Sequence, residues 1–159
     1  MKVVVGVADM RISNQPGDVV VTHALGSCLG LAVHDPQGRI GGILHVMLPQ
    51  SQINPEKAKV NPYMFVDTGV PAFFNELMAR GAVRGRLVVK LAGGANVQGG
   101  QEDRFAIGKR NYLLLRKMLW KNNILVKAEE VGGSSPRTMY LDVDSGRTWL
   151  LVNGQEKDL

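Results

Sequence analysis

One cysteine and one histidine stand in two neighbouring apolar runs in the N-terminal third of this 159-residue chain. Cys28, the only cysteine, follows a Leu-Gly-Ser turn and precedes the run 29–34, and His45 lies in the run 40–48. The segment 35–38, Asp-Pro-Gln-Gly, separates the two runs and is typical of a turn. We expect the runs to pair as a hairpin. A thiol within reach of an imidazole is the minimum requirement for nucleophilic catalysis.

These residue types favour acyl transfer. A free thiol is only a few per cent thiolate at neutral pH, so His45 must either lower the pKa of Cys28 or accept its proton. The thiolate would attack a carbonyl carbon while backbone N–H groups near Ser27 and Cys28 stabilise the oxyanion. His45 would then protonate the departing amine. Thr22 ends an expected strand, and its hydroxyl can orient the imidazole. The alternatives are an inert buried thiol, a core histidine and an ordinary strand threonine.

The net charge of +5 and the pI near 9.6 permit a nucleic acid, an acidic protein or a membrane surface as partner. The basic residues are scattered, however, and the densest group, between 109 and 121, has the spacing of a solvated helix face. The few aromatic residues do not alternate with basic ones as base-stacking platforms would. We therefore expect no nucleic-acid partner.

Cofactor and metal sites are not expected. The three histidines lack the spacing of zinc ligands, and one cysteine cannot complete a structural zinc site. The glycine-rich loop 93–104 lacks a phosphate-binding motif, because Gly108-Lys109 is followed by Arg110 rather than Ser or Thr. A single cysteine cannot form an internal disulfide, which favours the cytoplasm. No apolar stretch approaches the roughly 18–20 residues of a membrane span, so we expect no membrane insertion.

The hydrophobic pattern predicts one α/β domain over residues 1–159, a layered sandwich of mixed β-sheet with two main helices. We expect Asp67 or Thr68 to cap the first helix, which ends near 80, with Pro71 in its first turn. The apolar face of the second helix is expected to carry Ile107, Leu114, Leu115, Met118 and Leu119. Strands are expected at 3–8, 18–22, 29–34, 40–48, 87–92, 124–131, 138–143 and 147–152, and loops at 11–18, 49–62, 93–104 and 132–136.

Several motifs resemble the CheD family of chemoreceptor glutamine deamidases, over roughly residues 10–152. They are T-x-x-L-G-S-C at 22–28, G-G-x-x-H-x-M-L-P at 41–49, K-x-x-G-G-A at 90–95, I-G-x-R-N at 107–111, and G-G at 132–133 with Arg137. The resemblance implies a catalytic triad of Cys28, His45 and Thr22. It also implies the α/β sandwich fold that is related to the catalytic domain of cytotoxic necrotizing factor toxins. Further candidates, for oxyanion binding or substrate positioning, are Gly26, Ser27, Gly93 and Gly94.

The implied reaction converts glutamine side chains on the cytoplasmic helices of chemoreceptors to glutamate, with release of ammonia. Some members of the family also hydrolyse glutamyl methyl esters of receptors. A CheC-type phosphatase is the implied binding partner. The alternative function is a mainly non-catalytic regulatory module that binds such a phosphatase and the receptors.

Overall fold

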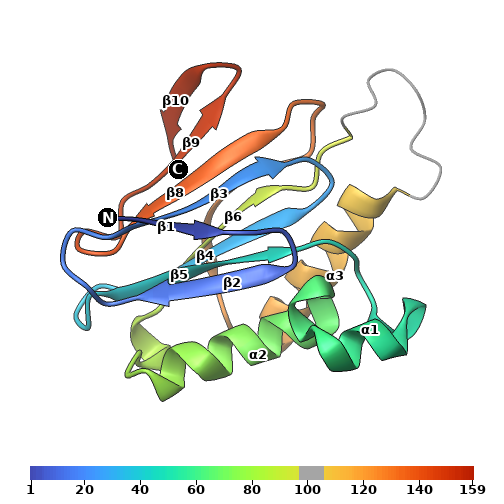
Figure 1. The fold of residues 1–159 in the computed structure, drawn as a ribbon, viewed down its shortest axis with the longest axis horizontal. Coiled ribbons are helices and arrows are strands. Elements are labelled where there is room, and N and C mark those ends of the chain that lie inside the picture. The colour runs from blue at the N-terminus through green and yellow to red at the C-terminus, as the bar shows by residue number, and fades with distance from the viewer. Residues whose placement is uncertain (97–105) are drawn as a thin grey trace.

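The computed structural model describes residues 1–96 and 106–159 as two stacked β-sheets with helices on one outer face (Figure 1). The strands are β1 (Lys2–Val5), β2 (Asp9–Ser13), β3 (Val19–Leu25), β4 (Leu29–Asp35), β5 (Ile40–Val46), β6 (Val88–Gly93), β7 (Val126–Val131), β8 (Arg137–Asp142), β9 (Thr148–Val152) and β10 (Gln155–Asp158). The helices are α1 (Pro55–Val60), α2 (Val66–Ala79) and α3 (Ile107–Lys121), with short 3-10 helices η1 (Ser51–Ile53), η2 (Pro62–Met64) and η3 (Arg84–Arg86). The predicted α/β layered sandwich with two main helices is confirmed.

Both sheets are mixed. The first, here sheet A, has the order β1-β3-β8-β9-β10, and the second, sheet B, has the order β2-β5-β4-β6-β7. Each contains one parallel pair, β1 with β3 and β6 with β7, and the other neighbours are antiparallel.

The β4–β5 hairpin lies at the centre of the molecule, because every residue of both strands is buried. Strand alternation divides its side chains between two cores. Leu31 and Leu44 belong to the core that sheet B forms with α2 and α3, whereas Ala32 and Ile43 belong to the core between the sheets. The predicted hairpin is therefore confirmed, and both of its faces are covered.

The carboxylate of Asp35 fixes the turn of this hairpin. It accepts hydrogen bonds from the backbone N–H groups of Gln37 and Gly38, both at 3.1 Å, and from that of Val83 at 2.9 Å. Arg86 donates to both of its oxygens, at 2.8–3.2 Å. Burial alone would raise the pKa of Asp35, but the hydrogen bonds and the Arg86 charge outweigh it and lower the pKa to about 2.

Helix α2 begins at Val66, two or three residues earlier than predicted. Phe65 is the capping residue, without a side-chain cap, and Asp67 instead accepts hydrogen bonds from the N–H and hydroxyl of Ser51 at 2.9 and 2.8 Å. Thr68 donates its hydroxyl to the carbonyl of Pro62. The predicted caps are wrong because both side chains have tertiary partners instead, Ser51 of η1 for Asp67 and Pro62 of η2 for Thr68. Pro71 consequently lies inside the helix, as its sixth residue.

Three segments predicted as turns or loops, or left unassigned, have regular structure. Residues 9–13 form β2 rather than the start of a turn, and residues 55–60 form helix α1 within the predicted loop 49–62. Strand β10 follows an Asn153-Gly154 turn in which both residues have positive φ, a typical hairpin signal. The sequence pattern missed β10 because its four residues are all polar and exposed. Most of the glycine-rich loop, 97–104, lies outside the described residues.

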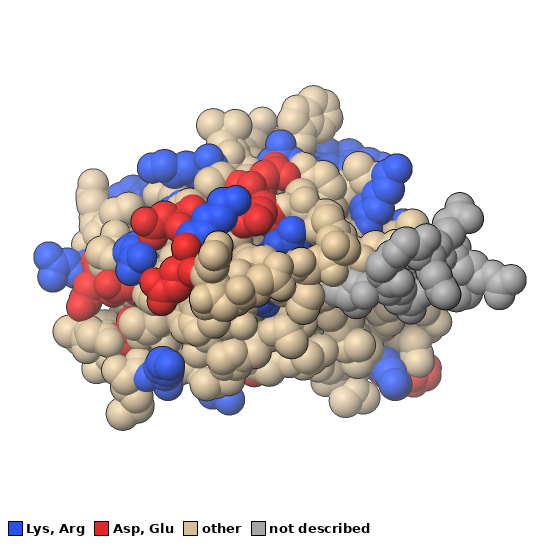
Figure 2. All heavy atoms as spheres, turned by 90° about the horizontal axis from the view of Figure 1, so that it is seen from above, with Lys and Arg blue, Asp and Glu red and all other residues tan. Residues whose placement is uncertain are grey.

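The surface carries charges of both signs. Figure 2 shows acidic and basic side chains next to one another on the side where β9 and β10 lie. There Arg147 pairs with Asp158 at 2.9 Å, and Lys157 pairs with Glu130 at 3.5 Å. This face therefore does not carry the charge of a single sign that nucleic-acid binding would need. Within residues 1–96 and 106–159, no helix is long and apolar enough to cross a membrane.

Candidate active site

The structure brings Thr22 and His45 together between the two sheets. Thr22 is on β3 of sheet A and His45 is on β5 of sheet B, and both are fully buried. The Thr22 hydroxyl oxygen lies 2.7 Å from Nδ1 of His45. Two residues that are far apart in sequence are thus joined by one hydrogen bond across the inter-sheet core.

A second hydrogen bond determines the protonation of the ring. The Thr22 hydroxyl donates to the carbonyl of Val5 at 2.9 Å, and a carbonyl can only accept. The hydroxyl oxygen must therefore accept its other hydrogen bond from Nδ1–H of His45. This places the proton on Nδ1 and the lone pair on Nε2. In the described structure the buried Nε2 has no hydrogen-bond partner.

The histidine is held neutral. Burial lowers the pKa of His45 from 6.5 to about 4, and the Asp9 carboxylate only partly opposes this. At neutral pH the imidazole is therefore a free base, with its accepting nitrogen already oriented.

Cys28 lies on the same side of sheet B as His45. His45 is opposite Gly30 in the β4–β5 register, and Cys28 precedes Gly30 by two residues and packs against the inter-sheet core. Diagonal neighbours of this kind are typically about 7–8 Å apart at Cα, within reach of long side chains. Among the described residues no hydrogen bond joins the thiol to His45, so contact between these two side chains stays a prediction.

The thiol is half-buried and protonated at rest. Burial raises the pKa of Cys28, and its own backbone N–H, which lies against the sulfur, only partly opposes this. Of the two ways of activating the thiol, the structure favours proton transfer to His45 over a permanent thiolate–imidazolium pair.

Each of the three carbonyl groups of the turn 26–28 accepts a hydrogen bond. Ala95 N–H donates to Gly26 at 2.8 Å, the Asn111 side chain donates to Ser27 at 3.1 Å, and Gly94 N–H donates to Cys28 at 2.9 Å. In the part of the chain that the structure describes, the N–H groups of Ser27 and Cys28 donate to no other residue. Two adjacent backbone donors beside the thiol are therefore available for an oxyanion.

Asn111 links this turn to the histidine strand. Its side-chain N–H₂ also donates to the carbonyl of Met47 at 2.9 Å, two residues after His45, and the side chain is fully buried. One amide thus fixes the spacing between the end of β5 and the turn that precedes Cys28. The sequence placed Asn111 in a family motif but gave it no role, because both of its partners are carbonyl groups of distant residues.

Gly93 and Gly94 support the turn from β6. Gly93 has φ +110°, and a Cβ there would overlap the carbonyl oxygen of Cys28. Its own carbonyl accepts from Arg137 at 3.1 Å and from the N–H of Gly132 at 2.9 Å. Because the Gly94 N–H is already used by Cys28, we expect these two glycines to position the nucleophile.

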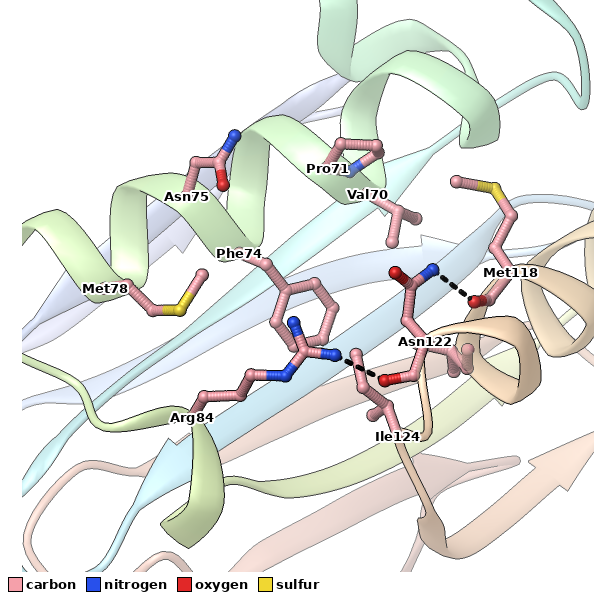
Figure 3. A pocket seen from close by; sticks show the side chains of 10 residues that line it. Val70, Pro71, Phe74, Asn75, Met78, Arg84, Met118, Asn122 and Ile124 are labelled. Atoms are coloured by element: carbon pink, nitrogen blue, oxygen red, sulfur yellow. Dashed lines mark hydrogen bonds between the residues drawn. The ribbon is translucent and has the colours of Figure 1, made fainter.

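A cavity of about 150 Å³ lies between α2 and the end of α3 (Figure 3). It is lined mainly by apolar side chains such as Phe74 and Met118, and Arg84 donates to the carbonyl of Asn122 at its edge. No predicted site residue lines it. Within the described residues no three His, Cys, Asp or Glu side chains are arranged to hold a metal ion.

The fold and the site together define a class of protein. Two mixed sheets, with helices on one outer face, enclose a buried threonine–histidine pair, and a half-buried cysteine lies on the same side of sheet B as the histidine. Residues 47–151 match the family model described as CheD chemotactic sensory transduction. This chain belongs to the CheD family.

Similar proteins match nearly the whole chain. A protein of Solibacter usitatus named probable chemoreceptor glutamine deamidase CheD is 51% identical over 158 residues, which is 99% of this chain and 93% of that protein. A Syntrophus aciditrophicus protein with the corresponding name is 42% identical over 96% of this chain and 94% of its own. A Thermococcus kodakarensis protein with the corresponding name is 36% identical over 92% of this chain and 90% of its own length. The family-model match begins at Met47, after Thr22, Cys28 and His45, whereas these matches extend over more than nine-tenths of the chain.

Proposed function

We propose that this protein is a cysteine-dependent deamidase of protein glutamine side chains and that chemoreceptors are its substrates. The observation that carries the proposal is the Thr22–His45 hydrogen bond, which leaves the Nε2 lone pair free on the side of sheet B where Cys28 lies. The names of the relatives supply the substrate class.

In the first half of the reaction, Cys28 loses its proton to Nε2 of His45 as the sulfur attacks the amide carbon of glutamine. The carbonyl oxygen becomes an oxyanion and accepts hydrogen bonds from the N–H groups of Ser27 and Cys28. His45 returns the proton to the nitrogen, the C–N bond breaks, and ammonia leaves. The product is a thioester between Cys28 and the glutamyl side chain.

Water completes the reaction. His45 accepts a proton from water as its oxygen attacks the thioester carbon, the C–S bond breaks, and the sulfur of Cys28 takes the proton back. The side chain leaves as glutamate. Throughout, Thr22 keeps Nδ1–H engaged, which stabilises the imidazolium while it exists. A methyl ester would follow the same course with methanol in place of ammonia, and we propose receptor methylesterase activity as a side reaction.

The decisive experiment incubates purified protein with the helical cytoplasmic fragment of a receptor and measures glutamine-to-glutamate conversion by peptide mass spectrometry. We expect conversion at particular glutamines by the wild type and none by Cys28→Ala. Unchanged glutamines with folded wild-type protein would refute the deamidase proposal for that substrate. If Cys28→Ala also preserved the signalling function in cells, the alternative of a non-catalytic module that binds receptors and a CheC-type phosphatase would be supported.

A further inference from the structure

Helix α3 has an exposed apolar line that the core does not use. Its inner face buries Leu115 and Leu119, whereas Leu113 is 54% exposed and Trp120 is 79% exposed. Seven residues make almost two full turns, so these two side chains lie along one line on the outer face. A tryptophan is among the side chains that gain most from burial, so an exposed tryptophan on one line with an exposed leucine is a suitable contact for a partner.

Basic residues border this line on both sides. The helix has no acidic residue, and its five cations are Lys109, Arg110, Arg116, Lys117 and Lys121. Arg116 pairs with Glu129 at 3.7 Å, and in the described structure the other four form no ion pair. Like charges this close on one helix repel one another and destabilise it. The outer face of α3 therefore differs from the β9–β10 side of Figure 2, where opposite charges pair.

This pattern of apolar and basic side chains on α3 fits a helix as the partner better than a membrane or a nucleic acid. A helix that lies in a membrane surface needs a broad apolar face, and the broad apolar face of α3 is already buried in the core. Nucleic acid would need several stacking rings, and Trp120 is the single aromatic side chain on this line. Leu113 and Trp120 are equivalent heptad positions with charged residues beside them, so they supply one of the two apolar rows along which helices pack.

We propose that the outer face of α3, defined by Leu113, Trp120 and the flanking cations, docks an α-helix of the protein substrate. The partner helix carries apolar residues at heptad spacing with Asp or Glu beside them. Oppositely charged flanks speed association and fix the register of the two helices.

This site deepens the proposed function and rests on it, because α3 begins at the catalytic turn. Gly108 packs so closely on the backbone of Gly94 that a Cβ could not fit, and Asn111 binds the turn itself. A substrate helix held along α3 would present glutamines near its end to Cys28, so docking selects which glutamines react.

The test compares two substrates, the helical receptor fragment and a short peptide around one reactive glutamine. With Leu113→Ala/Trp120→Ala we expect KM for the fragment to rise at least about tenfold, which corresponds to the loss of one well-packed aromatic contact. We expect kcat and all constants for the short peptide to stay unchanged. Lys117→Glu/Lys121→Glu should raise KM for the fragment similarly and abolish its dependence on salt. Val4→Ala and Lys2→Glu, exposed residues of β1, are the matched controls.

An unchanged KM for the fragment in both double variants would overturn the proposal. Preferential binding of the wild type to vesicles of anionic lipid, lost in the same variants, would overturn it in favour of a membrane. If neither substrate is deamidated, the proposed function fails. Fluorescence anisotropy with the labelled fragment and Cys28→Ala protein then still decides whether the α3 face binds a helix.

Discussion

At the scale of single residues, the Thr22 hydroxyl has the most specific role. It fixes the tautomer of His45 because its proton is used by Val5. We expect Thr22→Val, which keeps the shape and removes the acceptor, to lower kcat by at least about tenfold while KM changes little. Thr22→Ser keeps the hydroxyl and should retain most of the activity. Equal activity of the valine and serine variants would contradict the assigned tautomer.

The resting state of the thiol can be read from its alkylation rate. The raised pKa of Cys28 and the lowered pKa of His45 make both groups neutral near pH 7. The rate of alkylation by iodoacetamide should therefore rise with pH in a single step, with a midpoint above that of an ordinary cysteine. A plateau of fast reaction between pH 5 and 7, which is typical of a thiolate–imidazolium pair, would contradict this.

At the scale of elements, Asn111 joins α3 to the residues that follow β5 and to the turn 26–28. Asn111→Asp keeps the shape but removes both donors, and leaves two carbonyl groups unpaired. We expect kcat to fall about tenfold or more with little change in KM, and the free energy of unfolding to fall by about 1–3 kcal/mol. Asn122→Asp is the control, because exposed Asn122 also donates a side-chain hydrogen bond to a backbone carbonyl, that of Met118, but at the far end of α3. Equal kinetic effects of the two variants would refute a positioning role.

The β4–β5 turn depends on the buried charge of Asp35. Asp35→Asn leaves Arg86 without its counter-ion and weakens the hydrogen bonds by which this carboxylate joins the β4–β5 turn to η3. We expect the free energy of unfolding, measured in urea, to fall by about 3 kcal/mol. The control Asp158→Asn, which breaks an exposed pair with Arg147, should cost less than about 1 kcal/mol.

The sequence pattern predicted the elements with a strong hydrophobic periodicity. It missed elements and helix caps that depend on contacts with residues distant in the sequence. The β4–β5 hairpin and both main helices followed from apolar spacing and turn residues. Strand β2 is short, with polar side chains alternating at the sheet edge, and its pattern was obscured by the adjoining Pro16-Gly17 turn. The caps of α2 depend on contacts with Ser51 and Pro62, which no local pattern contains.

The candidate site divides in the same way. Thr22, Cys28 and His45 were predicted as site residues from their chemistry and from a family motif. The structure adds the direction of the Thr22–His45 hydrogen bond and the unpaired state of Nε2. Asn111 and Arg137 act on backbone carbonyl groups, and residue types and spacing do not indicate such partners. Only the folded chain reveals them.

At the scale of the whole molecule, two groups make stability depend on pH in the same direction. The folded state lowers the pKa of His45 from 6.5 to about 4 and that of Asp35 from 3.8 to about 2. Between the unfolded and the folded pKa of each group, the unfolded chain therefore binds more protons than the folded chain. The stability that each group contributes is complete above its unfolded pKa and is lost as the pH falls through its folded pKa. We expect losses of about 2–3 kcal/mol per group in urea titrations. His45→Gln should abolish the step between pH 6.5 and 4 and leave the lower one.

The hydrogen bond between Thr22 and His45 joins two different sheets, and this has a consequence for folding. In a chain in which only one sheet has formed, the folded part includes either His45 or Thr22 but not both. The Thr22–His45 hydrogen bond therefore exists only once the two sheets have docked. Under the proposed mechanism, full activity arises with the closing of the inter-sheet core.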